Sequence, residues 1–99
     1  PDAVKDIPIL SADNIQSSYY LRLRVEDRPG VLSEISRILA DSGISIGSMF
    51  QEPNEPGEAS IIFLLHRARE GAVSTAIQKM HELPFVRSEV TRLRVEDLI

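Results

Sequence analysis

Hydrophobic and polar residues alternate between Tyr19 and Glu26. A period of two is typical of a β-strand with one buried and one wet face, and it predicts a strand over this range. After a break at residues 27–30, the apolar positions recur at helical spacing. They are Val31, Leu32, Ile35, Ile38 and Leu39. This stripe predicts an amphipathic helix with Pro29 in its first turn and Gly43 as its C-terminal stop.

Two further strands, joined by a hairpin, are predicted in the middle of the chain. β-branched residues in the range 44–51 predict the first strand, and a cluster of turn residues at 53–57 predicts the connection. The nearly unbroken apolar run at 59–66 is typical of an interior strand. We expect the first of these strands to place four side chains on one face: Ile44, Ile46, Ser48 and Phe50.

A helix and a strand complete the domain. The range 70–82 has an apolar stripe at helical spacing, which consists of Val73, Ala76, Ile77 and Met80. The range 86–95 predicts a strand whose apolar positions change face midway, which indicates a bulge or a double-sided edge. Residues 1–18 contain two prolines and no sustained period. We interpret them as a linker or docking arm in front of a domain that covers residues 19–99.

The predicted order of elements is strand, helix, strand, strand, helix, strand. Right-handed crossovers in both β-α-β units interleave into a four-stranded antiparallel sheet with both helices on one face. The sequence therefore predicts an α+β, ferredoxin-like βαββαβ sandwich. The other face would contain Tyr20, Arg22, Arg24, Ile62 and Leu64. It is too apolar to be left wholly in water, so we expect it to meet another domain or subunit.

Length and charge narrow the possible functions. The 99 residues form one small domain with little room for a deep active site beside a core. A net charge of -4 and scattered basic residues argue against nucleic acid and anionic membranes as partners. The chain has no cysteine, and no apolar run reaches the roughly 18 residues of a membrane span. We expect a soluble, cytoplasmic binding module, and Pro1 at the start suggests a segment of a longer protein.

The segment from Asp27 to Leu32 is the best candidate site. A strand ends and a helix begins there, so free N–H groups and the positive end of the helix dipole would face a small anion such as a carboxylate. Asp27 beside them could hold an ammonium group, and a free amino acid has both charges close together. A tight turn, with Pro29 starting the helix and Gly30 giving steric relief, explains the same residues without a ligand.

Other chemistry has little support in the sequence. His66 and His81 lie in different elements, and no cysteine can complete a zinc site. Glu26 and Asp27 are adjacent, hence on opposite faces of a strand, which does not suit a catalytic pair. The serines have no nucleophile-elbow context, and the chain has no GxGxxG motif for a dinucleotide. Metal-dependent or acid–base catalysis is therefore not predicted.

The pattern Asp27–Leu32, followed by the helical stripe and by Gly43-Ile44-Ser45-Ile46, resembles the ACT domain over about residues 19–96. Further residues narrow the resemblance to one group of enzymes. Tyr19-Tyr20-Leu21-Arg22-Leu23, together with the arm that contains Ile7-Pro8-Ile9-Leu10, resembles the C-terminal part of bacterial homoserine dehydrogenases. The resemblance implies a non-catalytic regulatory domain that works beside the catalytic domain of a parent enzyme.

This resemblance further implies an amino-acid effector, threonine first, bound between two paired copies of the domain. The implied effector-binding residues are Asp27, Arg28, Pro29, Gly30, Val31, Leu32, Gly43, Ile44, Ser45 and Ile46. Many amino-acid-binding members have Asn where this chain has Ser45, whose hydroxyl reaches less far. No cofactor is implied for this chain, and NAD(P) would belong to the parent's interconversion of aspartate semialdehyde and homoserine.

Three alternatives remain in view. The domain could serve another enzyme of amino-acid metabolism, mainly for oligomerisation and without a ligand. Acylphosphatases share the fold, but they need an Arg and an Asn at an anion loop, and the only asparagines here are Asn14 and Asn54. RNA-recognition motifs place aromatics on the third strand and are usually basic, whereas this chain has only Phe63 there and is acidic.

Overall fold

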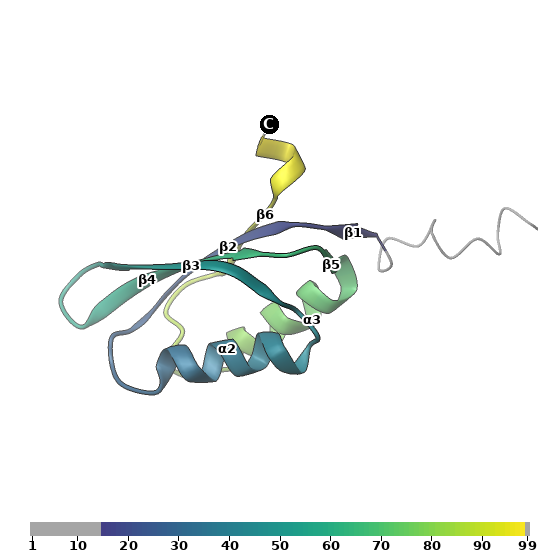
Figure 1. The fold of residues 1–99 in the computed structure, drawn as a ribbon. Helices are drawn as coiled ribbons and strands as arrows, with labels where there is room; N and C mark the ends of the chain where they lie inside the picture. The colour runs from purple at the N-terminus through teal and green to yellow at the C-terminus, as the bar shows by residue number, and fades with distance from the viewer. Residues whose placement is uncertain (1–14, 99) are drawn as a thin grey trace, which may run out of the picture.

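The computed structural model describes residues 15–98. Its main sheet has four antiparallel strands in the order β3-β4-β2-β6. The strands are β2 (Tyr19–Glu26), β3 (Ile46–Pro53), β4 (Glu58–Leu65) and β6 (Thr91–Arg94). Helices α2 (Val31–Asp41) and α3 (Glu70–His81) cover the same face of the sheet (Figure 1). The predicted ferredoxin-like sandwich is confirmed.

The core lies between this sheet and the two helices. The alternation in β2 has the expected effect, because Leu21, Leu23 and Val25 are buried while Arg22 and Arg24 are exposed. The helices supply the opposite wall with Val31, Ile35, Leu39, Val73, Ala76 and Met80. The other predicted stripe residues are half-buried at its margin: Leu32, Ile38 and Ile77.

A turn precedes α2, and it corrects the prediction for Pro29. Gly30 has φ 90° and ψ -20°, and the Val31 N–H donates to the Arg28 carbonyl over 3.4 Å. Pro29 and Gly30 are therefore the central residues of a type II turn, in which the third position needs a positive φ. Since that φ is incompatible with a helix, α2 begins only at Val31, and Pro29 lies outside its first turn.

Gly43 ends α2 as predicted. It has φ 75°, and its N–H donates to the Ala40 carbonyl over 2.9 Å. The Ile44 N–H donates to the Leu39 carbonyl, also over 2.9 Å. This pair of bonds is the Schellman motif, and the accompanying hydrophobic contact is possible because Ile44 and Leu39 are both buried in the core cluster.

The prediction that Ile44, Ile46, Ser48 and Phe50 share one face is wrong. Ile44 is buried in the core before β3 begins. Ile46 pairs with Leu65, but Ser48 pairs with Leu64, so a bulge at Gly47 shifts the register by one residue. A shift of one residue moves every later side chain to the opposite face. Ser48 and Phe50 consequently lie on the face away from the helices.

The last strand is shorter than the predicted range 86–95. Within this range only Thr91–Arg94 pair regularly with β2, and Val86 forms an isolated bridge with Val25. Between these points residues 87–90 bulge, as the change of phase predicted. The bulge is held by side-chain bonds, because the Arg24 N–H donates to Ser88 Oγ over 3.0 Å and the Val90 N–H donates to His81 Nε2 over 3.1 Å.

Two short strands and a terminal turn have no signal in the sequence pattern. Strand β1 (Gln16–Ser17) pairs antiparallel with β5 (Ala68–Arg69), and the 3-10 turn η3 (Val95–Leu98) follows β6. The greater part of the predicted arm, residues 1–14, lies outside the described residues. Within residues 15–98 no helix is long and apolar enough to cross a membrane.

On the sheet face away from α2 and α3, η3 is the described element that rises beside β6 (Figure 1), and we call this face the open face. Pairing places its side chains in neighbouring rows across the strands. The first row is Ser48, Leu64, Tyr20 and Leu93. The second row is Phe50, Ile62, Arg22 and Thr91. Phe50 is 53% exposed, so the expected apolar character of this face is present in the structure.

Candidate functional site

The start of α2 has free donors and open space. No side chain caps this helix, and the Glu34 N–H is already bonded to the Gly30 carbonyl over 3.0 Å. The N–H groups of Leu32 and Ser33 are the remaining donors of the first turn. A side chain at Gly30 would meet no atom within 4 Å. The predicted seat for a carboxylate therefore has both donors and room.

Asp27 lies beside this helix start, at the end of β2. Its side chain is exposed, and its N–H donates to the Gly57 carbonyl over 2.9 Å. Gly57 belongs to a second Pro-Gly turn, in which the Glu58 N–H donates to the Glu55 carbonyl over 2.8 Å. The hairpin turn thus fixes the backbone of Asp27, and its carboxylate bonds to no other described residue.

Glu26 holds Arg28 back against the domain. Arg28 Nε donates to Glu26 Oε2 over 2.9 Å, and Arg87 donates to the other carboxylate oxygen. The Arg28 guanidinium also stands 5.4 Å from the centre of the Phe85 ring. Arg28 is one of the predicted effector residues. In the single chain its side chain is bound to Glu26 and lies near Phe85, and its carbonyl forms the type II turn.

These bonds predict a pH dependence of stability. Hydrogen bonds from Arg28, and then from Arg87, hold the pKa of Glu26 below its ordinary value of 4.5. A carboxylate with a lowered pKa in the folded state stabilises the fold above the unfolded pKa, and this stabilisation is lost as the pH falls through the folded value. We expect the Glu26→Gln variant to be less stable than the wild type at pH 7.

The measurement is urea unfolding of both proteins from pH 7 down to pH 3. The difference in unfolding free energy should be constant down to about pH 4.5 and should shrink below it. A difference that does not change with pH would show that the Glu26 charge does not support the fold. Glu55→Gln, which removes an exposed carboxylate from the neighbouring turn, is the matched control.

The second predicted group, Gly43–Ile46, lies at the other end of α2. Ser45 is exposed, and its carbonyl accepts the His66 N–H over 3.0 Å at the start of β3. The 11 residues of α2 span about 16 Å, which separates this group from Asp27–Leu32. One chain therefore does not bring the two predicted groups together around a single amino acid.

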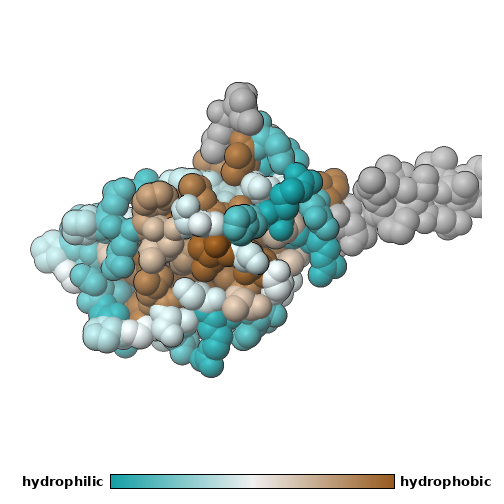
Figure 2. Space-filling model, viewed as in Figure 1, coloured by the Kyte–Doolittle hydropathy of each residue, from teal (hydrophilic) through white to brown (hydrophobic). Residues whose placement is uncertain are grey.

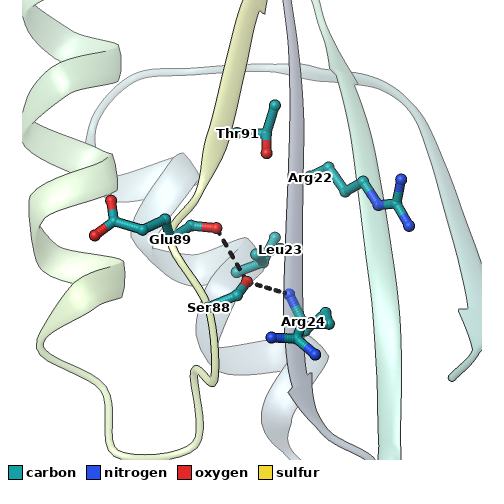
Figure 3. A pocket seen from close by; sticks show the side chains of 6 residues that line it. All are labelled: Arg22, Leu23, Arg24, Ser88, Glu89 and Thr91. Atoms are coloured by element: carbon teal, nitrogen blue, oxygen red, sulfur yellow. Dashed lines mark hydrogen bonds between the residues drawn. The ribbon is translucent and has the colours of Figure 1, made fainter. Parts of the chain in front are cut away.

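A pocket of about 280 Å³ lies elsewhere, where the bulge of residues 87–90 opens the sheet beside β2. Its lining residues are Arg22, Leu23, Arg24, Ser88, Glu89 and Thr91. Figure 3 shows Ser88 between the two segments, accepting from the Arg24 N–H and donating to the Glu89 carbonyl. The sequence predicted the bulge but not this hollow. None of the ten predicted effector residues lines it.

The two histidines lie in different parts of the fold. His81 Nε2 accepts a backbone N–H and fixes the bulge, while His66 follows β4. Within residues 15–98 no group of three or more His, Asp or Glu side chains is close enough to hold a metal ion.

Comparison with known proteins gives consistent results. The ACT domain family model matches residues 19–85. The chain is 47% identical to homoserine dehydrogenase of Methylobacillus glycogenes over 99% of its own length, and 40% identical to that of Pseudomonas aeruginosa. It spans only 24% and 23% of these two relatives.

Solved structures extend the comparison. A homoserine dehydrogenase from Thiobacillus denitrificans superposes with a TM-score of 0.78 at 46% identity, covering 90% of this chain and 20% of that protein. The ACT domain from GTP pyrophosphokinase of Chlorobium tepidum superposes with a TM-score of 0.65 at 16% identity, covering 80% of this chain and all of that domain. The second likeness concerns the fold alone.

Proposed function

This chain belongs to the ACT domain family, and on that basis we propose that it is the regulatory domain of a homoserine dehydrogenase. The identity of 47% over nearly the whole chain supports this parent. The NAD(P)-dependent interconversion of aspartate semialdehyde and homoserine, in cytoplasmic threonine and methionine biosynthesis, would then take place in a catalytic domain outside this chain. The chain itself would bind an effector and pair with a second copy.

The proposed effector is an amino acid. Threonine is the first candidate, because it is an end product of the pathway. The uncapped start of α2 carries this proposal, because it offers N–H donors and open space next to an exposed carboxylate. The effector carboxylate would accept from the N–H groups of Leu32 and Ser33, and its ammonium group would donate to Asp27. Charge-assisted bonds of this kind are about twice as strong as neutral ones.

A second copy would complete the site. Strand β3 is an edge strand, and Figure 2 shows hydrophobic side chains gathered over β3 and between it and α2. If two copies pair there about a two-fold axis, their α2 helices run antiparallel. The start of one helix then lies beside the end of the other. Asp27–Leu32 of one copy would thereby meet Gly43–Ile46 of its partner, including Ser45.

The test is calorimetric titration of the chain with each of the twenty amino acids, followed by sedimentation. We expect heat with threonine, and a mass of at least two copies. A paired protein that gives no heat with any amino acid would favour the alternative, an oligomerisation module without a ligand, which the short Ser45 side chain would suit. A monomer without binding would contradict both functions.

Substitutions at Gly30 test what the type II turn requires. A Cβ atom at Gly30 would meet no atom within 4 Å, so the φ of 90° decides what a substitution there costs the fold. We expect Gly30→Ala to lower the free energy of unfolding by about 1–2 kcal/mol, because a side chain disfavours positive φ. Gly30→Asn should cost less, since Asn tolerates this position of a type II turn. Urea unfolding of the two variants measures both losses of stability. Equal losses would exclude backbone strain as the cause.

A further inference from the structure

His66 lies directly opposite Ser45, at the end of the sheet where β3 begins. The His66 N–H donates to the Ser45 carbonyl over 3.0 Å, one step beyond the pair formed by Ile46 and Leu65. Directly opposite residues of antiparallel strands have their side chains on the same face, with Cβ atoms about 4.5–5.5 Å apart. Leu65 is buried in the core, so by alternation His66 and Ser45 both face away from it. Both residues are exposed.

Gly47, in the bulge of β3, makes room for the His66 ring. A Cβ atom at Gly47 would stand 3.1 Å from the Leu64 carbonyl oxygen, and 3.4 Å and 3.5 Å from Cε1 and Nε2 of His66. The φ of Gly47 is not positive, so the backbone conformation does not require a glycine there. Space is therefore what the glycine provides. The imidazole of His66 reaches across from the end of β4 and lies against the backbone of the bulge.

The two histidines differ in what their rings bond to. His81 Nε2 accepts the Val90 N–H and so holds the bulge of residues 87–90. Within residues 15–98, by contrast, neither ring nitrogen of His66 has a hydrogen-bond partner. A neutral imidazole has one N–H donor and one acceptor nitrogen. The ring is thus positioned against Gly47, and its hydrogen-bonding groups are available to a ligand.

We propose that His66 is part of the effector site and bonds to the side chain of the effector. This inference rests on the proposed function, in which Ser45 of one copy meets Asp27–Leu32 of the other. A ligand that reaches the Ser45 hydroxyl also comes within reach of the His66 ring, because the two side chains are neighbours on one face. The charged groups of the amino acid are bound at the start of α2, so its side chain is the part that remains for His66.

A neutral imidazole at this place selects a hydroxyl group on the effector. A hydroxyl both donates and accepts hydrogen bonds, so it matches the donor or the acceptor nitrogen of the ring. A methyl group in the same position makes neither bond. Threonine and valine have the same shape and differ in this one group, so His66 distinguishes the two. One neutral hydrogen bond corresponds to about a fivefold difference in affinity.

Calorimetric titration of the 99-residue chain with threonine and with valine tests the proposal. We expect the wild type to bind threonine about fivefold more tightly than valine. In His66→Phe the ring still packs against Gly47 but has no donor or acceptor, so the affinity for threonine should fall to that for valine. His66→Gln keeps a donor and an acceptor and should retain a preference for threonine.

A matched control adds the same ring elsewhere. Gln78 is exposed on α3, and Gln78→Phe should leave both affinities within twofold of the wild-type values. The variants at His66 are at an exposed position, so we expect their free energies of unfolding to stay close to that of the wild type.

Proton NMR of the wild type detects the same contact without any substitution. The chain has two histidines, and the loss of one ring signal in His66→Gln assigns both. Threonine should shift the Cε1 proton resonance of His66, and valine should shift it less. The resonance of His81 is the internal control and should stay in place, because its ring bonds to Val90 within the other bulge.

The outcomes separate His66 from the site as a whole. If the wild type binds both amino acids equally, or if His66→Phe keeps the wild-type preference, His66 does not contact the effector, and the proposed function stands without it. A His66→Phe variant that loses both amino acids to the same extent would show a structural role and would also overturn the proposal. If neither amino acid binds to the wild type, threonine as the effector and the role of His66 fail together.

Discussion

Replacing Asp27 with alanine is expected to weaken effector binding by about ten- to a hundredfold. Hydrogen bonds to charged groups contribute about 1.5–3 kcal/mol, which corresponds to this range of affinity. Asp27 is the exposed carboxylate at the end of β2, beside the uncapped start of α2. Its loss leaves the effector's ammonium group without its anionic partner. The measurement is a calorimetric titration with the amino acid that binds the wild type.

A control and a graded series sharpen this test. Glu55→Ala removes the same charge from the adjacent turn and should change the affinity less than twofold. Ser45 would contact the effector from the other copy, so Ser45→Ala should weaken binding by a smaller factor than Asp27→Ala. Ser45→Asn, with a longer side chain and an amide donor, should tighten it. If both Ser45 variants bind like the wild type, the start of β3 is not part of the site.

The largest loss of stability is expected from Phe63→Ala. Phe63 is 0% exposed, on the interior strand β4, within the core cluster. Removal of a buried Phe side chain costs about 3–5 kcal/mol through lost burial and the cavity left behind. The free energy of unfolding of small domains is about 5–15 kcal/mol in total, so the variant should be close to unfolding at room temperature.

Urea unfolding at a fixed protein concentration measures this effect. Phe63→Leu is the matched control, because it keeps most of the apolar volume and should cost less than about 1.5 kcal/mol. Similar small losses for both variants would mean that the core relaxes around β4 and that Phe63 is not its centre.

The regular elements were predictable because their patterns are local. The alternation over Tyr19–Glu26 and the stripe in α2 depend only on which side chains meet the core, and Gly43 ends the helix through its own backbone. Pro29 was placed wrongly because Pro-Gly suits both a helix start and a type II turn. Only the φ of the glycine distinguishes the two.

The irregular parts depend on contacts between distant segments. The bulge at Gly47 is defined by pairing with β4, and the hollow beside residues 87–90 depends on the bond from the Arg24 N–H to Ser88. The two-residue strands β1 and β5 are too short for a periodic pattern, and only their mutual pairing identifies them. Sequence patterns do not report such partners.

The candidate site was likewise predictable only in part. Its ten residues came from the resemblance to a family, and the loop chemistry at Asp27 supported the first group. The engagement of Arg28 by Glu26 and Phe85 was not predictable, since Phe85 is far from it in sequence. The sequence predicted the two groups of residues at opposite ends of one helix. A single sequence does not say how a second copy is placed.

The shortness of β6 has a consequence for how such a sheet can grow. A sheet with two long free edges can add further copies at both ends and polymerise into a fibre. Strand β3 offers an edge of eight residues, whereas β6 has four, and before it Ser88 replaces a backbone partner in the ladder. In the main sheet, β3 is therefore the edge that is long enough to pair with another sheet. If copies pair edge to edge, addition stops at two, and the bulge of residues 87–90 prevents growth into a fibre.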